Sequence, residues 1–187
     1  TINSPRTLVL TGYCSTNDIR KKITPDFKKV GNHILYIDLS DNHMGMSGSS
    51  YSYINKHLGN SDDSPQLRNV LLLKKVFNLI QKWINDGIIL SGHDRSDGGL
   101  ITTVTEMAIS SGFGYHLNIQ NKENIDKFMF NEELGIIIEV EEKNLNEIMS
   151  SLNCIYNLGH ITQDTCYITY NKHIELNCPI SSLTIMW

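Results

Sequence analysis

Short apolar runs alternate with longer segments of helical periodicity along this chain, and that alternation limits the possible folds more than any other feature. Nine runs have the length and composition of β-strands: Leu8–Thr11, His33–Leu39, Ile88–Gly92, Gly114–Ile119, Gly135–Val140, Ile155–Ile161, Cys166–Tyr170, His173–Leu176 and Leu183–Trp187. Four segments between them have a helical pattern: Ser49–Leu58, Pro65–Asp86, Leu100–Ser111 and Lys143–Leu152. Strands that alternate with helices, followed by a strand-rich end, predict an α/β fold with a mixed sheet. The strands on either side of Tyr170–His173 are predicted to form a hairpin.

The two longest predicted helices each carry one apolar face. In the Pro65–Asp86 segment this face consists of Val70, Leu73, Val76, Phe77, Ile80, Trp83 and Ile84. In the Leu100–Ser111 segment it consists of Leu100, Val104, Met107, Ala108 and Ser111. Pro65 is placed in the first turn of its helix, where proline is tolerated. Both faces are interpreted as surfaces that pack in the core, with no cofactor assigned to them.

Length and composition exclude several classes of protein. A chain of 187 residues predicts one domain over residues 1–187, which needs neither a disulfide nor a metal to fold. The net charge of −4 and the scattered Lys and Arg argue against a nucleic-acid surface. The sequence has no membrane-length apolar run, no signal-peptide pattern and no closely spaced cysteines, so we expect a cytoplasmic protein without a zinc motif. Because Thr1 opens the chain and an apolar run soon follows, we expect a domain excised from a longer protein.

The stretch SGHDRSDGGL, Ser91–Leu100, forms a turn between a predicted strand and a predicted helix. Ser96 or Asp97 can cap this helix, and two glycines allow unusual backbone angles or a close approach by another group. A helix N-terminus attracts phosphate, but aspartates beside it would repel phosphate unless a cation such as Mg²⁺ lay between them. One interpretation is therefore a magnesium–nucleotide site in which Asp94 is a metal ligand, Ser96 donates to phosphate and Asp97 caps the helix. The alternative is a capped turn in which Asp94 pairs with Arg95 or is solvated.

A second glycine-containing stretch, DNHMGMSGSS at Asp41–Ser50, also lies between a strand and a helix. It lacks the lysine of a phosphate-binding P-loop. Two interpretations stay open: an anion-binding loop, or a polar loop in which Ser47 or Ser49 caps the following helix. His43 is expected to be exposed.

Two adjacent carboxylates, Glu132 and Glu133, occur in the stretch FNEELG. Neighbouring side chains on a turn point in different directions, which makes them a poor acid–base pair. They are interpreted as a helix end or a solvated turn.

Several of these stretches, taken in order, resemble the phosphoribosylformylglycinamidine synthase family. The resemblance rests on HDRSDGGL followed by EMA, on FNEELG and LGHIT, and on DIRKKITPDFK, LYIDLS and SSLTIMW near the two ends. It implies a protein with two repeats of the aminoimidazole ribonucleotide synthetase type, each with an A and a B subdomain. This chain resembles the second B subdomain, a three-layer α/β/α unit with partial ferredoxin-like topology.

The resemblance also implies an activity for the parent protein. Enzymes of the family transfer ammonia from glutamine to formylglycinamide ribonucleotide, and they use ATP and Mg²⁺ to activate the amide oxygen as an iminophosphate. By this resemblance Asp94 is a Mg²⁺ ligand and Ser96 contacts the nucleotide, ATP or ADP, at the second, structural nucleotide site. No role is carried over to Gly45–Ser49, because the family pattern resembles LGGS where this chain reads MGMSGSS.

The expected partners are the A subdomains, a glutaminase domain and the small-molecule nucleotide, with no nucleic acid or membrane. Because the catalytic His, most of the ATP site and the glutaminase nucleophile belong to those other parts, the chain alone is expected to be inactive. The alternatives are a non-catalytic scaffold stabilised by nucleotide, a pseudoenzyme relative, or another ATP-using member of the superfamily.

Overall fold

A computed structural model describes residues 9–16, 18–57, 59, 63–120 and 124–187 of the chain. In these ranges seven strands form one sheet in the order β2-β4-β1-β5-β3-β6-β7. The strands are β1 (His33–Asp38), β2 (Ile89–Asp94), β3 (Gly114–Ile119), β4 (Gly135–Val140), β5 (Ile155–Thr162), β6 (Thr165–Tyr170) and β7 (His173–Pro179). The helices are α1 (Ser50–Ile54), α2 (Val70–Asn85), α3 (Gly99–Ser111), α4 (Ile125–Phe130), α5 (Glu142–Ser151) and α6 (Ile180–Met186), after a short 3₁₀ turn at Ile19–Lys21.

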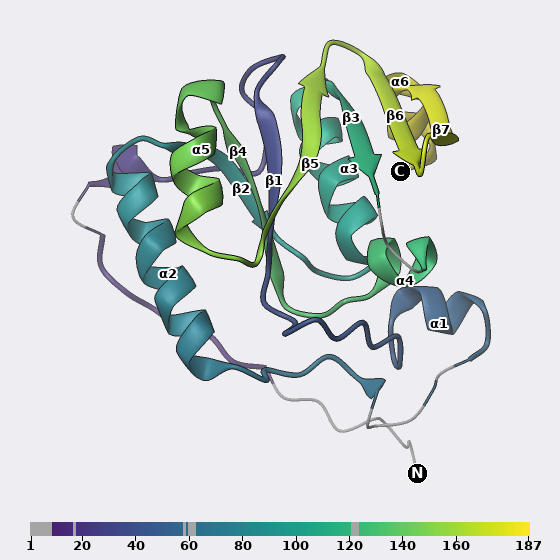
Figure 1. The fold of residues 1–187 in the computed structure, drawn as a ribbon, viewed down its shortest axis with the longest axis horizontal. Helices are drawn as coiled ribbons and strands as arrows, with labels where there is room; N and C mark the ends of the chain where they lie inside the picture. The colour runs from purple at the N-terminus through teal and green to yellow at the C-terminus, as the bar shows by residue number, and fades with distance from the viewer. Residues whose placement is uncertain (1–8, 17, 58, 60–62, 121–123) are drawn as a thin grey trace.

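Helices cover both faces of this sheet, which gives three layers. Figure 1 shows α2 and α5 over the half of the sheet that contains β2, β4 and β1. On this side Val76 and Trp83 of α2 and Ile148 of α5 pack against strand residues such as Leu35 and Ile138. On the other side α3, α4 and α6 pack against Tyr36, Leu117 and their neighbours. The predicted three-layer α/β/α fold with a mixed sheet is confirmed.

The position of β1 inside the sheet explains the pattern of its sequence. Ile34 and Tyr36 face the α3 side, whereas Leu35 and Ile37 face the α2 side, and all four are fully buried. A strand that is buried on both faces has a continuous apolar run instead of an alternating one. β1 pairs antiparallel with β4 and β5, and β3 with β6 is the parallel pair of the described sheet.

A buried carboxylate ties the segment before β1 to the sheet. Glu139 of β4 accepts hydrogen bonds from the backbone N–H groups of Lys28 and Lys29 at 2.8 and 3.1 Å. It also accepts from Asn32 Nδ2 and Ser91 Oγ, each at 2.7 Å. Because every donor lies 48 or more positions away, this carboxylate joins parts of the chain that have no local contact.

The structure changes the start of the longest helix. α2 begins at Val70 and not at Pro65, because Asn69 caps it by accepting a hydrogen bond from the N–H of Leu72 at 2.9 Å. Its buried face is also narrower than predicted, since Val70 and Phe77 are 62% and 58% exposed. The apolar face predicted for α3 is buried from Leu100 to Ala108.

Other predicted elements also differ. Leu183–Trp187 is not a strand: Pro179 precedes α6, which packs Ile180 into the core. The strand predicted at Leu8–Thr11 is absent for its residues 9–11, whereas Leu8 lies outside the described residues. α1 ends at Ile54, and the left-handed φ of +59° at Lys56 ends the helical path, whereas Leu58 lies outside the described residues.

The hairpin at Tyr170–His173 is confirmed, with Asn171 and Lys172 both at positive φ. Within the described ranges, no helix has the length and apolar character that crossing a membrane requires.

Candidate functional site

Three loops meet at one edge of the sheet, where β1 and β2 end and β4 begins. Asp94 pairs with Ile136, and Asp38 pairs with Gly135, so the ends of β2 and β1 flank the first residues of β4. The N–H of Arg95 continues this pairing to the carbonyl of Gly135 at 2.8 Å. The two glycine-containing stretches and FNEELG therefore lie together, although they are far apart in the sequence.

Asp94 presents its carboxylate to solvent at this edge. Its side chain is 78% exposed, and the Ser96 hydroxyl donates to its Oδ2 at 2.8 Å. The Nδ1 atom of His93 lies 3.4 Å from the other oxygen and hydrogen bonds to the Asp94 carbonyl at 2.7 Å. Asp94 and Ser96, the two residues predicted to form a site, are thus in contact and accessible.

Arg95 does not pair with Asp94, so that part of the capped-turn alternative is wrong. Its guanidinium is buried and donates to the carbonyls of Glu133 and Leu134, the latter at 3.2 Å. It also lies over the ring of Tyr36, 5.1 Å from the centroid. Burial lowers the pKa of Arg95 from its usual value, although the nearby Tyr36 and the carboxylates oppose that shift. The arginine thus holds the turn against β4 and leaves Asp94 free.

The start of α3 differs from both capping predictions. Gly98 and Gly99 adopt left-handed φ values of +83° and +77°, and no side chain caps the helix from within the turn. Asp97 is therefore not the cap, and Ser96 is not either. A Cβ on Gly99 would lie 2.7 Å from the carbonyl oxygen of Met129, so the close approach that glycine permits here is by the chain itself.

Glu132 takes the place of a cap at α3. A single oxygen, Oε1, accepts from the N–H of Gly98 at 2.7 Å and from the N–H of Ser50 at 2.8 Å. A carboxylate of the chain therefore occupies the position that a phosphate would take at this helix N-terminus. Asp94 and Ser96 are the accessible polar groups beside it.

Glu133 is a buried hub and not part of a solvated turn. The residue is 0% exposed and its carboxylate contacts His43 Nδ1 at 2.6 Å, Arg68 Nη2 at 3.2 Å and the N–H of Gln66 at 3.3 Å. His43, which was predicted to be exposed, is half-buried, with 34% of its side chain exposed. Gly45 packs so tightly here that a Cβ would lie 2.9 Å from Glu133 Oε1. The contacts of the buried Glu133 carboxylate with His43 and Arg68 hold the loop that follows β1 against the sheet edge.

The loop before α1 was predicted either to bind an anion or to cap the following helix through Ser47 or Ser49, and the structure shows a serine cap. Ser49 caps α1 by accepting from the N–H of Ser52 at 3.1 Å. A cavity of about 410 Å³ separates this loop from the turn before α3, and its lining consists of Gly48, Ser49, Ser50, Tyr53, Ile54, Asp97 and Glu132. The two glycine-containing stretches therefore face each other across one cavity.

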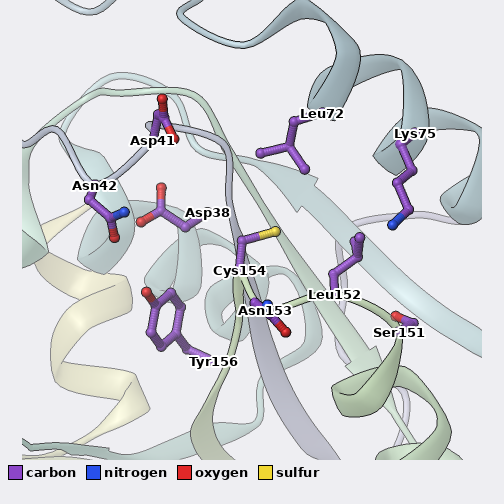
Figure 2. A pocket seen from close by; sticks show the side chains of 10 residues that line it. All are labelled: Asp38, Asp41, Asn42, Leu72, Lys75, Ser151, Leu152, Asn153, Cys154 and Tyr156. Atoms are coloured by element: carbon purple, nitrogen blue, oxygen red, sulfur yellow. The ribbon is translucent and has the colours of Figure 1, made fainter.

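A second cavity, of about 380 Å³, opens on the α2 side of the same edge (Figure 2). Asp38 and Asp41 lie on one side of it and Lys75 of α2 on the other, with Cys154 between them. Asp38 accepts from the hydroxyl of Tyr36 at 3.1 Å and from the N–H of Ser40 at 2.9 Å. Burial raises the pKa of the Cys154 thiol, which keeps it protonated and unreactive near neutral pH.

The described part of the chain contains no group of three or more His, Cys, Asp or Glu side chains that could hold a metal ion. Mg²⁺ commonly takes one or two protein carboxylates and fills its remaining positions with water and phosphate oxygens. An exposed Asp94 fits that use, but as one contribution to a site and not as the whole of it.

Sequence comparisons place these features in a known family. The family model for the C-terminal domain of AIR synthase related proteins matches residues 29–171. The probable phosphoribosylformylglycinamidine synthase, chloroplastic/mitochondrial, of Arabidopsis thaliana is 35% identical over 154 residues, which cover 81% of this chain and 11% of that protein. The phosphoribosylformylglycinamidine synthase of Dictyostelium discoideum is 37% identical over 161 residues, which cover 81% of this chain and 12% of that protein. The chain therefore spans little more than a tenth of the length of these relatives.

Solved structures share the fold at low sequence identity. Thermotoga maritima PurL complexed with FGAR superposes with a TM-score of 0.73 at 11% identity, over 89% of this chain and 30% of that one. The hydrogenase maturation protein HypE has a TM-score of 0.57 at 15% identity, over 80% of this chain and 52% of that one. These structures show the shared fold, and the match over residues 29–171 shows that the chain belongs to the family of the AIR synthase related protein C-terminal domain.

Proposed function

We propose that this chain is the second B subdomain, a single domain over residues 1–187, of a phosphoribosylformylglycinamidine synthase. The parent enzyme would use ATP and glutamine to convert formylglycinamide ribonucleotide to formylglycinamidine ribonucleotide in purine biosynthesis. Support comes from the two relatives, which carry that name and are 35% and 37% identical to this chain. PurL, which shares the fold, has been described in complex with FGAR, with ATP and with ADP.

Within that enzyme, Asp94 would be a Mg²⁺ ligand and Ser96 a contact to the nucleotide. The observation that carries this assignment is the exposed Asp94 carboxylate, which receives a hydrogen bond from Ser96 while the neighbouring arginine is engaged elsewhere. A bound Mg²⁺ would supply positive charge between this carboxylate and the phosphates. The chain's own part is to hold Asp94 at the end of a rigid strand, with Arg95 anchoring the turn behind it.

The same proposal makes the chain inactive by itself. The residues that it contributes form one side of a site, and the remaining metal ligands would come from an A subdomain. The expected partners are thus the A subdomains and the glutaminase domain of the parent protein, together with ATP or ADP and Mg²⁺.

A calorimetric titration of Mg–ADP against the chain and its Asp94→Asn variant tests the site. Asp164→Asn is the matched control, since Asp164 is an exposed carboxylate in the turn between β5 and β6, at the opposite end of the sheet from Asp94. We expect Asp94→Asn to weaken binding and the control to leave it unchanged. Equal binding by all three proteins would remove Asp94 from the site and favour a scaffold with its nucleotide elsewhere.

A second assay tests the proposed inactivity. The chain is mixed with ATP, Mg²⁺, ammonia and formylglycinamide ribonucleotide, and ADP release is measured. We expect no release above background, and measurable turnover would overturn this part of the proposal.

A further inference from the structure

Part of the sheet carries histidine and tyrosine side chains on the face opposite α3. Tyr115 and Leu117 of β3 are in the core beneath α3, so the intervening His116 projects from the other face. Tyr167 of β6 lies between two core residues in the same way. In Figure 1, α2 and α5 lie over the half of the sheet that contains β2, β4 and β1, away from β3 and β6.

Two histidines are neighbours on this face. His116 and His160 are partners in the antiparallel β3–β5 register, and their ring centroids are 5.2 Å apart at an interplanar angle of 78°. Tyr167, the partner of His116 on the other side, has its ring 5.0 Å from that of His116. A register shift in β5 beside Gly159 precedes His160, and a Cβ at Gly159 would overlap the carbonyl oxygen of His116. The glycine thus allows β5 to approach β3 closely where the two rings meet.

The ring of His116 is left with an uncompensated nitrogen. Its Nε2 atom is buried and has no hydrogen-bond partner in the part of the chain that the structure describes. A buried polar atom of this kind requires a partner or a ligand, because its desolvation is otherwise uncompensated. Burial, together with the nearby His160, lowers the pKa of His116, so the imidazole is neutral near pH 7. Neutral imidazole is the form that binds metal ions.

The rings are in edge-to-face contact, and their spacing is also compatible with a shared metal ion. A zinc–nitrogen bond of about 2.0–2.1 Å, added to about 1.15 Å from a ring nitrogen to its centroid, places each centroid about 3.2 Å from the ion. At a tetrahedral angle the two centroids would then be about 5.2 Å apart. The observed separation is 5.2 Å. We propose that His116 and His160 together ligate one divalent transition-metal ion of the zinc or nickel class, through one ring nitrogen each.

This site would have two protein ligands, with water in the remaining positions. His33 of β1 is the register partner of His160 on its other side, but its ring contacts Glu142 and Asn157. The described ranges contain no group of three or more His, Cys, Asp or Glu side chains that could hold a metal ion. Two imidazoles without a carboxylate suit zinc, nickel and copper better than magnesium, which prefers oxygen. The site is separate from Asp94 and Ser96, so its test is independent of the proposed nucleotide site.

Calorimetry tests this site in chelator-free buffer at pH 7.5. ZnCl₂ and, separately, NiCl₂ are titrated into the parent chain and into the His116→Gln and His160→Gln variants. His173→Gln is the control, because His173 is an exposed histidine on β7 outside the pair. Each single variant is expected to bind about tenfold more weakly or worse, because losing one of two linked ligands removes the chelate advantage. The control is expected to bind like the parent.

Histidine ring resonances followed by NMR identify the site directly. At substoichiometric zinc, the His116 and His160 signals should shift or broaden before those of the other histidines. His160 is exposed, so His160→Gln serves even if His116→Gln fails to fold. Equal affinity in the parent and His160→Gln, or ring signals that do not respond, would overturn the proposal.

Discussion

Replacing Glu139 by Gln is expected to reduce the free energy of unfolding by about 2–4 kcal/mol. Two donors, Lys29 N and Asn32 Nδ2, contact Oε1, and two others, Lys28 N and Ser91 Oγ, contact Oε2. An amide can accept on one side only, so a backbone N–H of Lys28 or Lys29 must face the new NH₂ group. Hydrogen bonds to a charged group contribute about 1.5–3 kcal/mol each, and an unsatisfied buried donor costs about 1–3 kcal/mol.

Urea denaturation followed by tryptophan fluorescence measures this loss, because Trp83 is buried in the core that forms between α2 and the sheet. Glu147→Gln is the control: it makes the same change at an exposed position on α5 and should stay within about 0.5 kcal/mol of the parent. Hydrogen exchange should also speed up at the amides of Lys28 and Lys29. A loss below about 1 kcal/mol for Glu139→Gln, with exchange unchanged, would refute this account of the four hydrogen bonds.

Four further outcomes follow from the structure. Gly159→Ala would place a Cβ against the carbonyl of His116 and should destabilise the fold by about 1–3 kcal/mol in the same denaturation assay. Burial raises the pKa of the Cys166 thiol to about 11, which keeps it protonated at pH 8. Iodoacetamide at pH 8 should therefore label the exposed Cys14 within minutes and Cys166 only under unfolding conditions, as measured by peptide mass spectrometry. Glu132→Ala removes the carboxylate that accepts from the backbone N–H groups of Ser50 and Gly98, at the N-termini of α1 and α3. Hydrogen exchange at these two amides should accelerate, whereas the amides of β4 should stay protected. The pKa of His116 is lower in the folded state, so as pH falls below about 6.5 this histidine is protonated in the unfolded chain before it is protonated in the folded one. The free energy of unfolding should therefore fall in that pH range. His116→Gln should reduce the drop in melting temperature between pH 7.5 and 5.5.

The parts of the fold that depend on local pattern were predictable from the sequence. The run HILYID marks β1, and the spacing of Leu100, Val104 and Met107 marks the buried face of α3. The hairpin turn at Asn171 and Lys172 is equally local, because it depends on backbone conformations that neighbouring residues define. Asp94 and Ser96 are two residues apart, so their contact also lay within reach of the sequence.

Long-range partners decided the features that sequence patterns did not predict. Glu133 contacts His43 and Arg68, which are 90 and 65 positions away in the sequence. Because neither partner is nearby in the chain, the adjacent pair Glu132 and Glu133 was interpreted as a helix end or a solvated turn. The C-terminal segment is rich in residues that favour strands, yet tertiary packing of Ile180 makes it a helix. The cap at α3 is supplied by Glu132, 34 residues from Gly98, and no rule for adjacent residues could assign it.

The order of strands in the sheet has a consequence for how this chain is made. β1 lies inside the sheet, but its two neighbours, β4 and β5, are synthesised much later, and β2 joins the sheet only through β4. Between Asp38, the last residue of β1, and Val140, the last of β4, the ribosome adds residues for about 5–20 s at ordinary rates of synthesis. During that interval the apolar residues of β1 have no strand to pair with. Nascent chains arrested before Val140 should therefore expose this segment and recruit chaperones, whereas chains arrested well beyond Thr162 should resist protease.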